Sequence, residues 1–321
     1  MKITASEIIK IFYKVILCRD PDSDGLKHHT KFLNSIDKIA PKLKEILYSD
    51  EFSDVYIKNK MQLNYIDFLE KKPKLIPLDG ESKFYDKLFD CALKLEDKSY
   101  LEVHKRRFHD LICTLDECLR HVTKPRLLEI GPSVATRIYS VYMEKLNINT
   151  IDRPVHLGGI DEKCALKLGS SKHYNIDLNL QSINSSSDLS RQEEYDYVVC
   201  TEVLEHLTVC PYEFVEGIIS ILKPGGYLYL TTPNFFSHHN CKLLYKQKNP
   251  QELYPKKSDN LDAHYHHREY EMMELCEIFK TCGGNIVYSY WSDCWDEKGI
   301  EKLVPNCMFS NLVFLVKKLN N

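Results

Sequence analysis

The sequence lacks the features that place a chain in or across a membrane. No run of about 18 apolar residues, the shortest that reads as a membrane-spanning helix, occurs among its 321 residues. Near the N-terminus the apolar residues are interrupted by Glu7, Lys10 and Lys14, and no small-residue cleavage site follows, so we expect no signal peptide. The sequence therefore predicts a cytoplasmic protein.

Metal-binding cysteine patterns and a strong charge are also missing. The chain has 12 cysteines but no C-x-x-C pair and no Cys/His cluster at zinc spacing. Scattered cysteines such as Cys113 and Cys200 fit buried, reduced thiols. The net charge of −3 argues against a nucleic-acid partner, because binding to phosphates needs a strongly basic surface. We expect neither zinc nor nucleic acid.

The N-terminal part of the chain has helical periodicity. Thr4 and Glu7 stand at the spacing of a capping box, ahead of apolar residues that recur at helical intervals. Two prolines and a glycine without periodicity then indicate a linker. The predicted organisation is a helical accessory domain, a linker, a helical lead-in and a large C-terminal domain, at residues 1–70, 71–80, 81–124 and 125–321.

From Pro125 onward, short apolar runs alternate with helical stretches. This alternation is typical of an α/β fold with a doubly wound, mostly parallel sheet. The last two runs have no convincing helix between them, so we expect them to pair antiparallel. The predicted strands are residues 126–131, 149–154, 174–176, 196–201, 227–233, 285–291 and 310–318, and the clearest helix is 212–222.

In such a sheet, ligands bind where the strands end, so the residues there are candidates for the site. Gly131 follows the first strand, where a glycine lets the backbone approach a ligand, although it equally fits a plain turn. Asp152 ends the second strand, where an acid accepts hydrogen bonds from ribose hydroxyls, or is merely a surface acid before Pro154. Asp177 ends the third, as an adenine contact or a helix N-cap.

Two further segments complete the pattern. Residues 195–207 contain a buried-type strand followed by Val-Leu-Glu205-His206, and residues 222–234 contain Leu-Lys-Pro-Gly-Gly. Pro224 and Gly225 are the central pair expected of a type II turn that leads into the next strand.

These motifs, in this order over about residues 125–318, resemble the class I S-adenosylmethionine (SAM)-dependent methyltransferases, whose sheet has seven strands. Ser133 and Ala135 replace the second and third glycines usual in that family. The resemblance implies SAM as the cofactor. It places Glu129, Gly131, Ser133 and Ala135 along the methionine part, Asp152 at the ribose, Asp177 and Leu178 at the adenine, Thr201 and Glu202 beside the methionine end, and Leu204, Glu205 and His206 near the methyl group.

After the 227–233 strand, an insertion ends in His266-His-Arg268-Glu269-Tyr270. This resembles the H-x-R-E-Y motif of methyltransferases encoded with surface-polysaccharide and lipid-linked sugar pathways. It implies a sugar or glycan acceptor, glycan-assembly enzymes as partners, and transfer to a hydroxyl. A histidine pKa near about 6.5 suits proton removal, so His206 is the first candidate base and His266 the second, with the Glu205 carboxylate as a third candidate. No His-x-x-x-His pair or acidic cluster indicates a metal.

The segment that begins at Asp20 matches the start of a calcium loop, but Lys31 occupies the twelfth position, where a glutamate is required. The N-terminal residues better resemble a bacterial helical domain of unknown function, on Phe12-Tyr13, Leu17, Arg19, Pro21-Asp22, Gly25 and Ser49-x-Glu51-Phe52. Two other functions stay open: an N- or C-methyltransferase acting on a small metabolite, and a SAM-binding scaffold without activity. The sequence specifies no oligomeric state.

Overall fold

The computed structural model describes residues 4–16, 19–32, 42, 46, 98–142, 146–183, 194–251, 265–296 and 304–319. The chain divides into two compact units, Met1–Lys71 and Lys72–Asn321. The predicted linker and the start of the predicted helical lead-in lie outside the described residues.

In the first unit, helix α1 (Ala5–Ile16) begins at the predicted capping box. The Thr4 backbone N–H donates to Glu7 Oε2 at 2.7 Å, and the Glu7 N–H donates to Thr4 Oγ1 at 3.3 Å. Helix α2 (Ser23–Phe32) occupies the segment that begins like a calcium loop. Asp22 Oδ1 accepts hydrogen bonds from the N–H groups of Asp24 and Gly25, so this acid supports the start of a helix.

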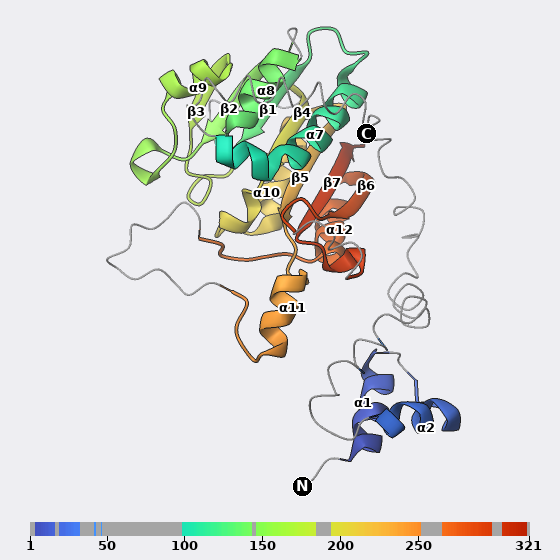
Figure 1. Cartoon of the computed structure of the whole chain (residues 1–321). Helices are drawn as coiled ribbons and strands as arrows, with labels where there is room; N and C mark the ends of the chain where they lie inside the picture. Colours follow the sequence, from blue (N-terminus) through green and yellow to red (C-terminus); the bar gives the residue numbers. More distant parts are fainter. Residues whose placement is uncertain are drawn as a thin grey trace. The chain divides into compact units, whose positions relative to one another are not determined.

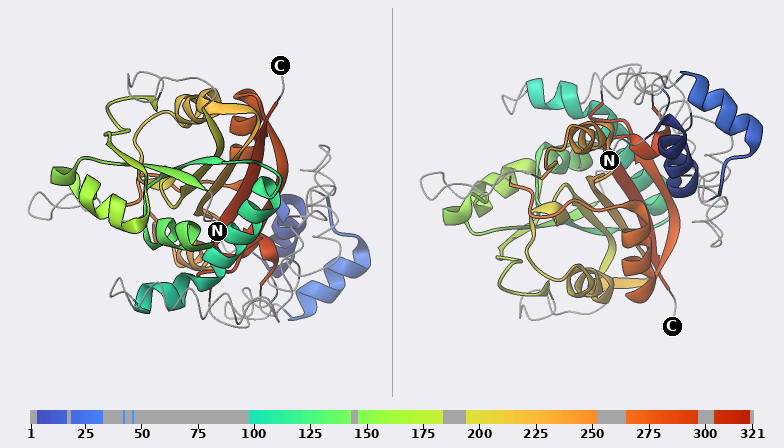
Figure 2. Two further views of the ribbon diagram at one scale, coloured as in Figure 1. Left: turned by 90° about the horizontal axis from the view of Figure 1, so that it is seen from above. Right: turned by 90° about the horizontal axis from the view of Figure 1, so that it is seen from below.

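The second unit is built on one seven-stranded sheet with the strand order β3-β2-β1-β4-β5-β7-β6 (Figures 1 and 2). The first five strands in sequence are parallel, and β7 runs antiparallel to both β5 and β6. The doubly wound fold and its antiparallel closing pair are therefore confirmed. The strands are β1 (Arg126–Ile130), β2 (Asn147–Asp152), β3 (Lys172–Asn175), β4 (Tyr195–Thr201), β5 (Leu222–Pro233), β6 (Gly284–Ser292) and β7 (Asn311–Lys318).

Helices cover both faces of the sheet (Figure 2). On one face, α7 (Lys98–Leu119) and α8 (Val134–Tyr142) enclose a core that includes Phe108, Tyr139 and Tyr197. On the other, α10 (Pro211–Ile221) and α12 (Met272–Thr281) pack beside each other and against β5 and β6. The remaining helices are α9 (Glu162–Leu168) beside β3 and α11 (His238–Tyr245) in the insertion after β5.

Strand β5 begins earlier than its predicted start at Tyr227. Gly225 has a φ of 75°, as the third position of a type II turn requires, yet the strand runs on through it from Leu222. Tyr195 of the neighbouring β4 pairs with Leu222 and Tyr197 pairs with Tyr227, so the extra residues of this irregularity lie in β5.

The strand order reverses between β1 and β4, which places a crevice at their carboxyl ends. Within the described residues, no helix is both long and apolar enough to cross a membrane.

Candidate active site

A cavity of about 810 Å³ opens at the carboxyl ends of the parallel strands, a volume typical of small-molecule sites. Its lining includes ten of the predicted site residues: Gly131, Ser133, Asp152, Asp177, Leu178, Thr201, Glu202, Glu205, His206 and His266. The structure therefore brings together residues from motifs that lie far apart in the sequence.

Three other predicted residues, Glu129, Ala135 and Leu204, are buried and do not belong to the cavity lining. Glu129 accepts hydrogen bonds from the hydroxyls of Thr136 and Tyr139. Complete burial raises the pKa of this carboxyl to about 8. These side chains support the site from behind its surface.

The turn from β1 into α8 explains why Gly131 stands at the cavity. Its φ of 75° lies in the left-handed region, and a Cβ atom there would approach Val203 Cγ2 to 2.6 Å. Two residues on, Ser133 Oγ accepts a hydrogen bond from the Ala135 N–H at 3.1 Å, which supports the first turn of α8. Where the family usually has a glycine, Ser133 therefore contributes a side-chain hydrogen bond to the turn.

Asp152 is the last residue of β2, and Asp177 follows the neighbouring strand β3; both residues line the cavity. Asp152 Oδ1 and Oδ2 accept the N–H groups of Arg153 and Ile160, each at 2.8 Å, so one carboxylate holds both ends of the intervening loop. Burial raises the pKa of Asp152 above its ordinary value. Asp177 Oδ1 accepts the Asn179 N–H at 3.0 Å.

Glu202 follows β4 with a φ of 56°, a left-handed conformation that is uncommon for a side chain of this size. Its Oε1 accepts hydrogen bonds from Thr231 Oγ1 at 2.5 Å and from Asn311 Nδ2 at 2.8 Å. These contacts hold the strained residue in place at the cavity wall.

Two lining residues, Arg107 and Trp295, carried no signal in the sequence. Arg107 lies on α7, ahead of the first strand motif, and its Nη1 is 3.5 Å from Glu202 Oε1. Its guanidinium carbon stands 5.4 Å from the ring centroid of Trp295. Only the packing of α7 against the sheet brings this positive charge to the cavity.

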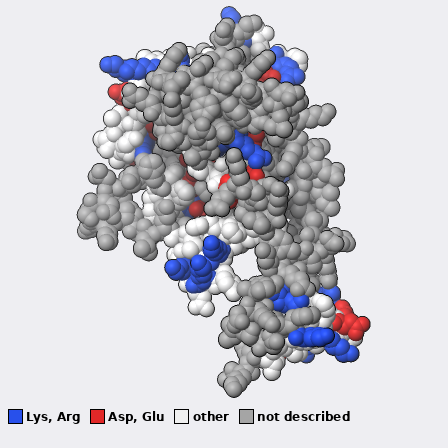
Figure 3. Space-filling model, viewed as in Figure 1, with Lys and Arg blue, Asp and Glu red and all other residues white. Residues whose placement is uncertain are grey.

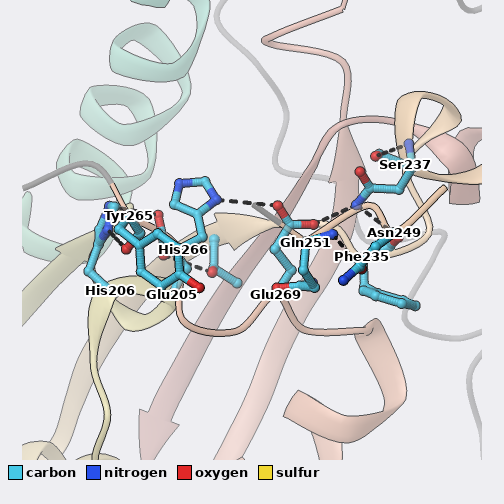
Figure 4. A network of polar contacts seen from close by, with 11 residues as sticks. Glu205, His206, Phe235, Ser237, Asn249, Gln251, Tyr265, His266 and Glu269 are labelled. Carbon is cyan, nitrogen blue, oxygen red and sulfur yellow. Dashed lines mark hydrogen bonds and ion pairs between the residues drawn. The ribbon is translucent and has the colours of Figure 1, made fainter. Parts of the chain in front are cut away.

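One polar group in the cavity lining consists of Glu205, His206 and His266 (Figure 4). Glu205 is 1% exposed, and its Oε1 lies 3.7 Å from His206 Nε2. The two histidine rings are edge to face with centroids 4.9 Å apart. Burial raises the pKa of Glu205 well above its ordinary value and lowers the pKa of His206. Both shifts favour the neutral forms.

Backbone hydrogen bonds connect the H-x-R-E-Y segment to the residues that follow β4. The N–H groups of His267 and Arg268 donate to the Glu205 carbonyl oxygen at 2.7 and 3.3 Å. Arg268 pairs with Glu274 in the first turn of α12, and Tyr270 is buried. These anchors leave His266 facing the cavity beside His206.

The fold and the cavity together define a Rossmann-like methyltransferase. The sequence matches the family described as a methyltransferase domain over residues 103–289, more than half of the chain, so the chain belongs to that family. It is a SAM-dependent methyltransferase, and SAM is its cofactor. No curated protein matches the chain.

Solved structures to which the chain is similar share little sequence with it. A SAM-dependent methyltransferase of Methanosarcina mazei is 15% identical, with a TM-score of 0.44 over 65% of this chain and 98% of that one. The 1,6-didemethyltoxoflavin-N1-methyltransferase of Burkholderia thailandensis, with bound S-adenosylhomocysteine, is 15% identical, with a TM-score of 0.41 over 78% and 93%.

Proposed function

We propose that this methyltransferase transfers the methyl group of SAM to a hydroxyl of a sugar, in a bacterial surface glycan or its precursor. The observation that carries the proposal is the Glu205–His206–His266 cluster, which lies in the cavity at the end of β4 and includes the histidine of the H-x-R-E-Y segment. This cluster supplies polar groups suited to a hydroxyl acceptor.

The cavity offers a fitting set of contacts for the cofactor. The close backbone approach at Gly131, where a Cβ atom would clash, leaves room for the methionine part. Asp152 would hold the ribose, and Asp177 with Leu178 the adenine, which extends the cavity toward β3. Glu202 and Arg107 present opposite charges at one wall, which matches the ammonium and carboxylate groups of the methionine end.

Bound SAM supplies an electrophilic methyl group on a sulfonium. The acceptor oxygen would attack the methyl carbon in line, so that a C–O bond would form as the C–S bond breaks and the electron pair of the C–S bond returns to sulfur. The acceptor hydroxyl loses its proton on the side of Glu205, His206 and His266. The Nδ1 atoms of His206 and His266 face the oxygens of Tyr265 and Glu269. A histidine whose Nδ1 donates a hydrogen bond accepts a proton at Nε2 when its ring is uncharged.

The insertion after β5 supports a polyhydroxylated acceptor. It contributes hydrogen-bonding side chains to the cavity wall, namely Ser237, His239, Asn240, His266 and Glu269. The same insertion exposes basic side chains around α11, where Lys242, Lys246 and Lys248 are exposed beside Tyr245 (Figure 3). Such a surface suits a glycan or its phosphorylated precursor, because lysines attract anionic groups.

The test is product analysis with isotope-labelled SAM and the surface glycan precursors of the source, together with mass spectrometry of its surface glycan with and without this protein. We expect one labelled O-methyl ether per acceptor, and the loss of a methyl ether from the glycan when the protein is absent. A labelled methyl group on a nitrogen or carbon atom of a small metabolite would show that the acceptor is not a sugar hydroxyl. Binding of SAM with no transfer to any acceptor would indicate a scaffold.

A further inference from the structure

Among the described residues, one group of side chains offers three metal-ligating atoms close together. Glu205 and His206 follow β4, His266 precedes α12, and their ligand atoms all lie within 4.8 Å of one another (Figure 4). The sequence gives no sign of this group, because the two histidines lie in separate motifs.

The carboxylate of Glu205 is only half satisfied. Its Oε2 accepts a hydrogen bond from Thr232 Oγ1 at 2.9 Å, whereas its Oε1 is buried and has no hydrogen-bond partner. Burying an unpartnered carboxylate oxygen is costly unless a positive charge lies against it. Oε1 lies 3.7 Å from His206 Nε2, so a cation held between these side chains would contact it.

Both histidines are oriented as metal-ligating histidines are. His206 Nδ1 donates to the Tyr265 carbonyl oxygen at 2.9 Å, and His266 Nδ1 donates to Glu269 Oε1 at 3.2 Å. Glu269 is itself held by Asn240, whose Nδ2 donates to its Oε2. In metal-ligating histidines, a hydrogen bond from one ring nitrogen to a carbonyl or carboxylate oxygen fixes the tautomer. When that nitrogen is Nδ1, the Nε2 atom is the one that binds the metal.

We propose that Glu205, His206 and His266 bind a divalent transition-metal cation, which coordinates the acceptor hydroxyl. Two imidazoles and one carboxylate suit Mn²⁺, Fe²⁺ or Zn²⁺ better than Ca²⁺ or Mg²⁺. Ligand atoms about 2.1 Å from one ion are roughly 3–3.5 Å apart, so Glu205 Oε1 and His206 Nε2, at 3.7 Å, need only a small movement.

This site deepens the proposed function and rests on it. The three ligands line the cavity, so an ion that they held would be accessible to an acceptor in the cavity. A coordinated hydroxyl is more acidic, as metal-bound water is. The hydroxyl proton then passes to solvent water instead of to a histidine, and the acceptor oxygen attacks the methyl carbon as described above.

The experiment titrates the chelator-treated full-length protein with Mn²⁺ alone, followed by electron paramagnetic resonance, with Zn²⁺ as competitor. We expect one Mn²⁺ per chain, displaced by Zn²⁺. Substitutions His206→Ala, His266→Ala and Glu205→Gln should each weaken binding at least about tenfold. His267→Ala is the matched control, because this neighbouring histidine is exposed and outside the group, and it should bind Mn²⁺ as the wild type does.

Binding of S-adenosylhomocysteine, measured on the same samples, separates the two proposals. Every variant that retains this binding is folded at the site. A wild type that binds S-adenosylhomocysteine but no Mn²⁺, or a His266→Ala variant that binds Mn²⁺ as well as the wild type, overturns the metal site alone. A wild type that binds Mn²⁺ but not S-adenosylhomocysteine contradicts the proposed reaction and leaves the metal site standing.

Discussion

At the scale of single residues, Asp152 serves two purposes that can be separated by substitution. Its carboxylate holds the loop between Arg153 and Ile160, and it also lines the cavity. Asp161 makes a comparable local contact, accepting the Cys164 N–H at the start of α9, but it does not line the cavity. The pair therefore distinguishes loss of a local hydrogen bond from loss of a ligand contact.

Asp152→Ala should weaken binding of SAM by about 2–3 kcal/mol, the scale for charge-assisted hydrogen bonds to the ribose. Asp161→Ala should leave the affinity close to that of the wild type. Calorimetry with each folded variant measures both. Equal affinities in the two variants would show that the ribose is held elsewhere.

His206 and His266 should act on the acceptor and not on SAM. Replacing either with alanine should lower kcat by about 10²–10⁴-fold, the range for assisted proton removal, while the affinity for S-adenosylhomocysteine stays nearly unchanged. Turnover on the identified acceptor and calorimetry give the two quantities. Wild-type turnover in both variants would leave Glu205, or positioning alone, to account for the rate.

Glu129 predicts a pH dependence of stability. Its pKa in the folded protein is about 8, above the ordinary value of 4.5, so the folded state keeps a proton that the unfolded state has lost. The free energy of unfolding therefore falls as the pH rises from about 4.5 to about 8. The Glu129→Gln variant has no carboxyl to titrate here, so its stability should not fall in this way. The Tm of the variant relative to the Tm of the wild type should therefore rise by roughly 2 °C or more from pH 5 to pH 8. A difference independent of pH would contradict the burial argument.

At the scale of elements, the turn from β1 into α8 brings the backbone to the cavity. Comparing a glycine in this turn with a glycine elsewhere separates the cost of the left-handed backbone from the cost of close packing. Gly131 and Gly283 both have positive φ, at 75° and 82°. A Cβ atom at Gly131 would meet Val203, whereas a Cβ atom at Gly283 would meet nothing within 4 Å.

Each Gly→Ala substitution should cost about 1–2 kcal/mol for the left-handed backbone. Gly131→Ala should cost more and should also weaken binding of S-adenosylhomocysteine, because Val203 or the turn must move. Thermal unfolding and calorimetry on both variants test this. If the two variants lose the same stability and neither loses affinity, the close approach at Gly131 has no role in cofactor binding.

At the scale of the whole molecule, the ten lining residues that the sequence predicted all lie in the second compact unit. We therefore expect a protein truncated to begin at about residue 80 to bind SAM with the affinity of the full chain, in the micromolar range or tighter, about −8 kcal/mol. Calorimetry of both proteins is the measurement. A truncated protein that folds without binding SAM would show that the N-terminal residues contribute to the site.

The sequence by itself determined the features that depend on neighbours along the chain. The capping box at Thr4 and Glu7, the alternation of strands and helices, and acids that end β2 and follow β3 are local patterns, because hydrogen bonds and periodicity act over a few residues. Ordered motifs of this kind were sufficient to predict the methyltransferase fold and ten of the residues that line its cavity.

Tertiary structure alone decided which distant side chains meet. The bonds from His267 and Arg268 to the Glu205 carbonyl bring His266 beside His206, and no pattern of either segment specifies that contact. Packing of α7 adds Arg107 to the cavity, and packing of α8 encloses Ala135 in the core, away from the cavity lining. Such contacts depend on how whole elements bury their apolar faces, so they arise only when the chain is folded.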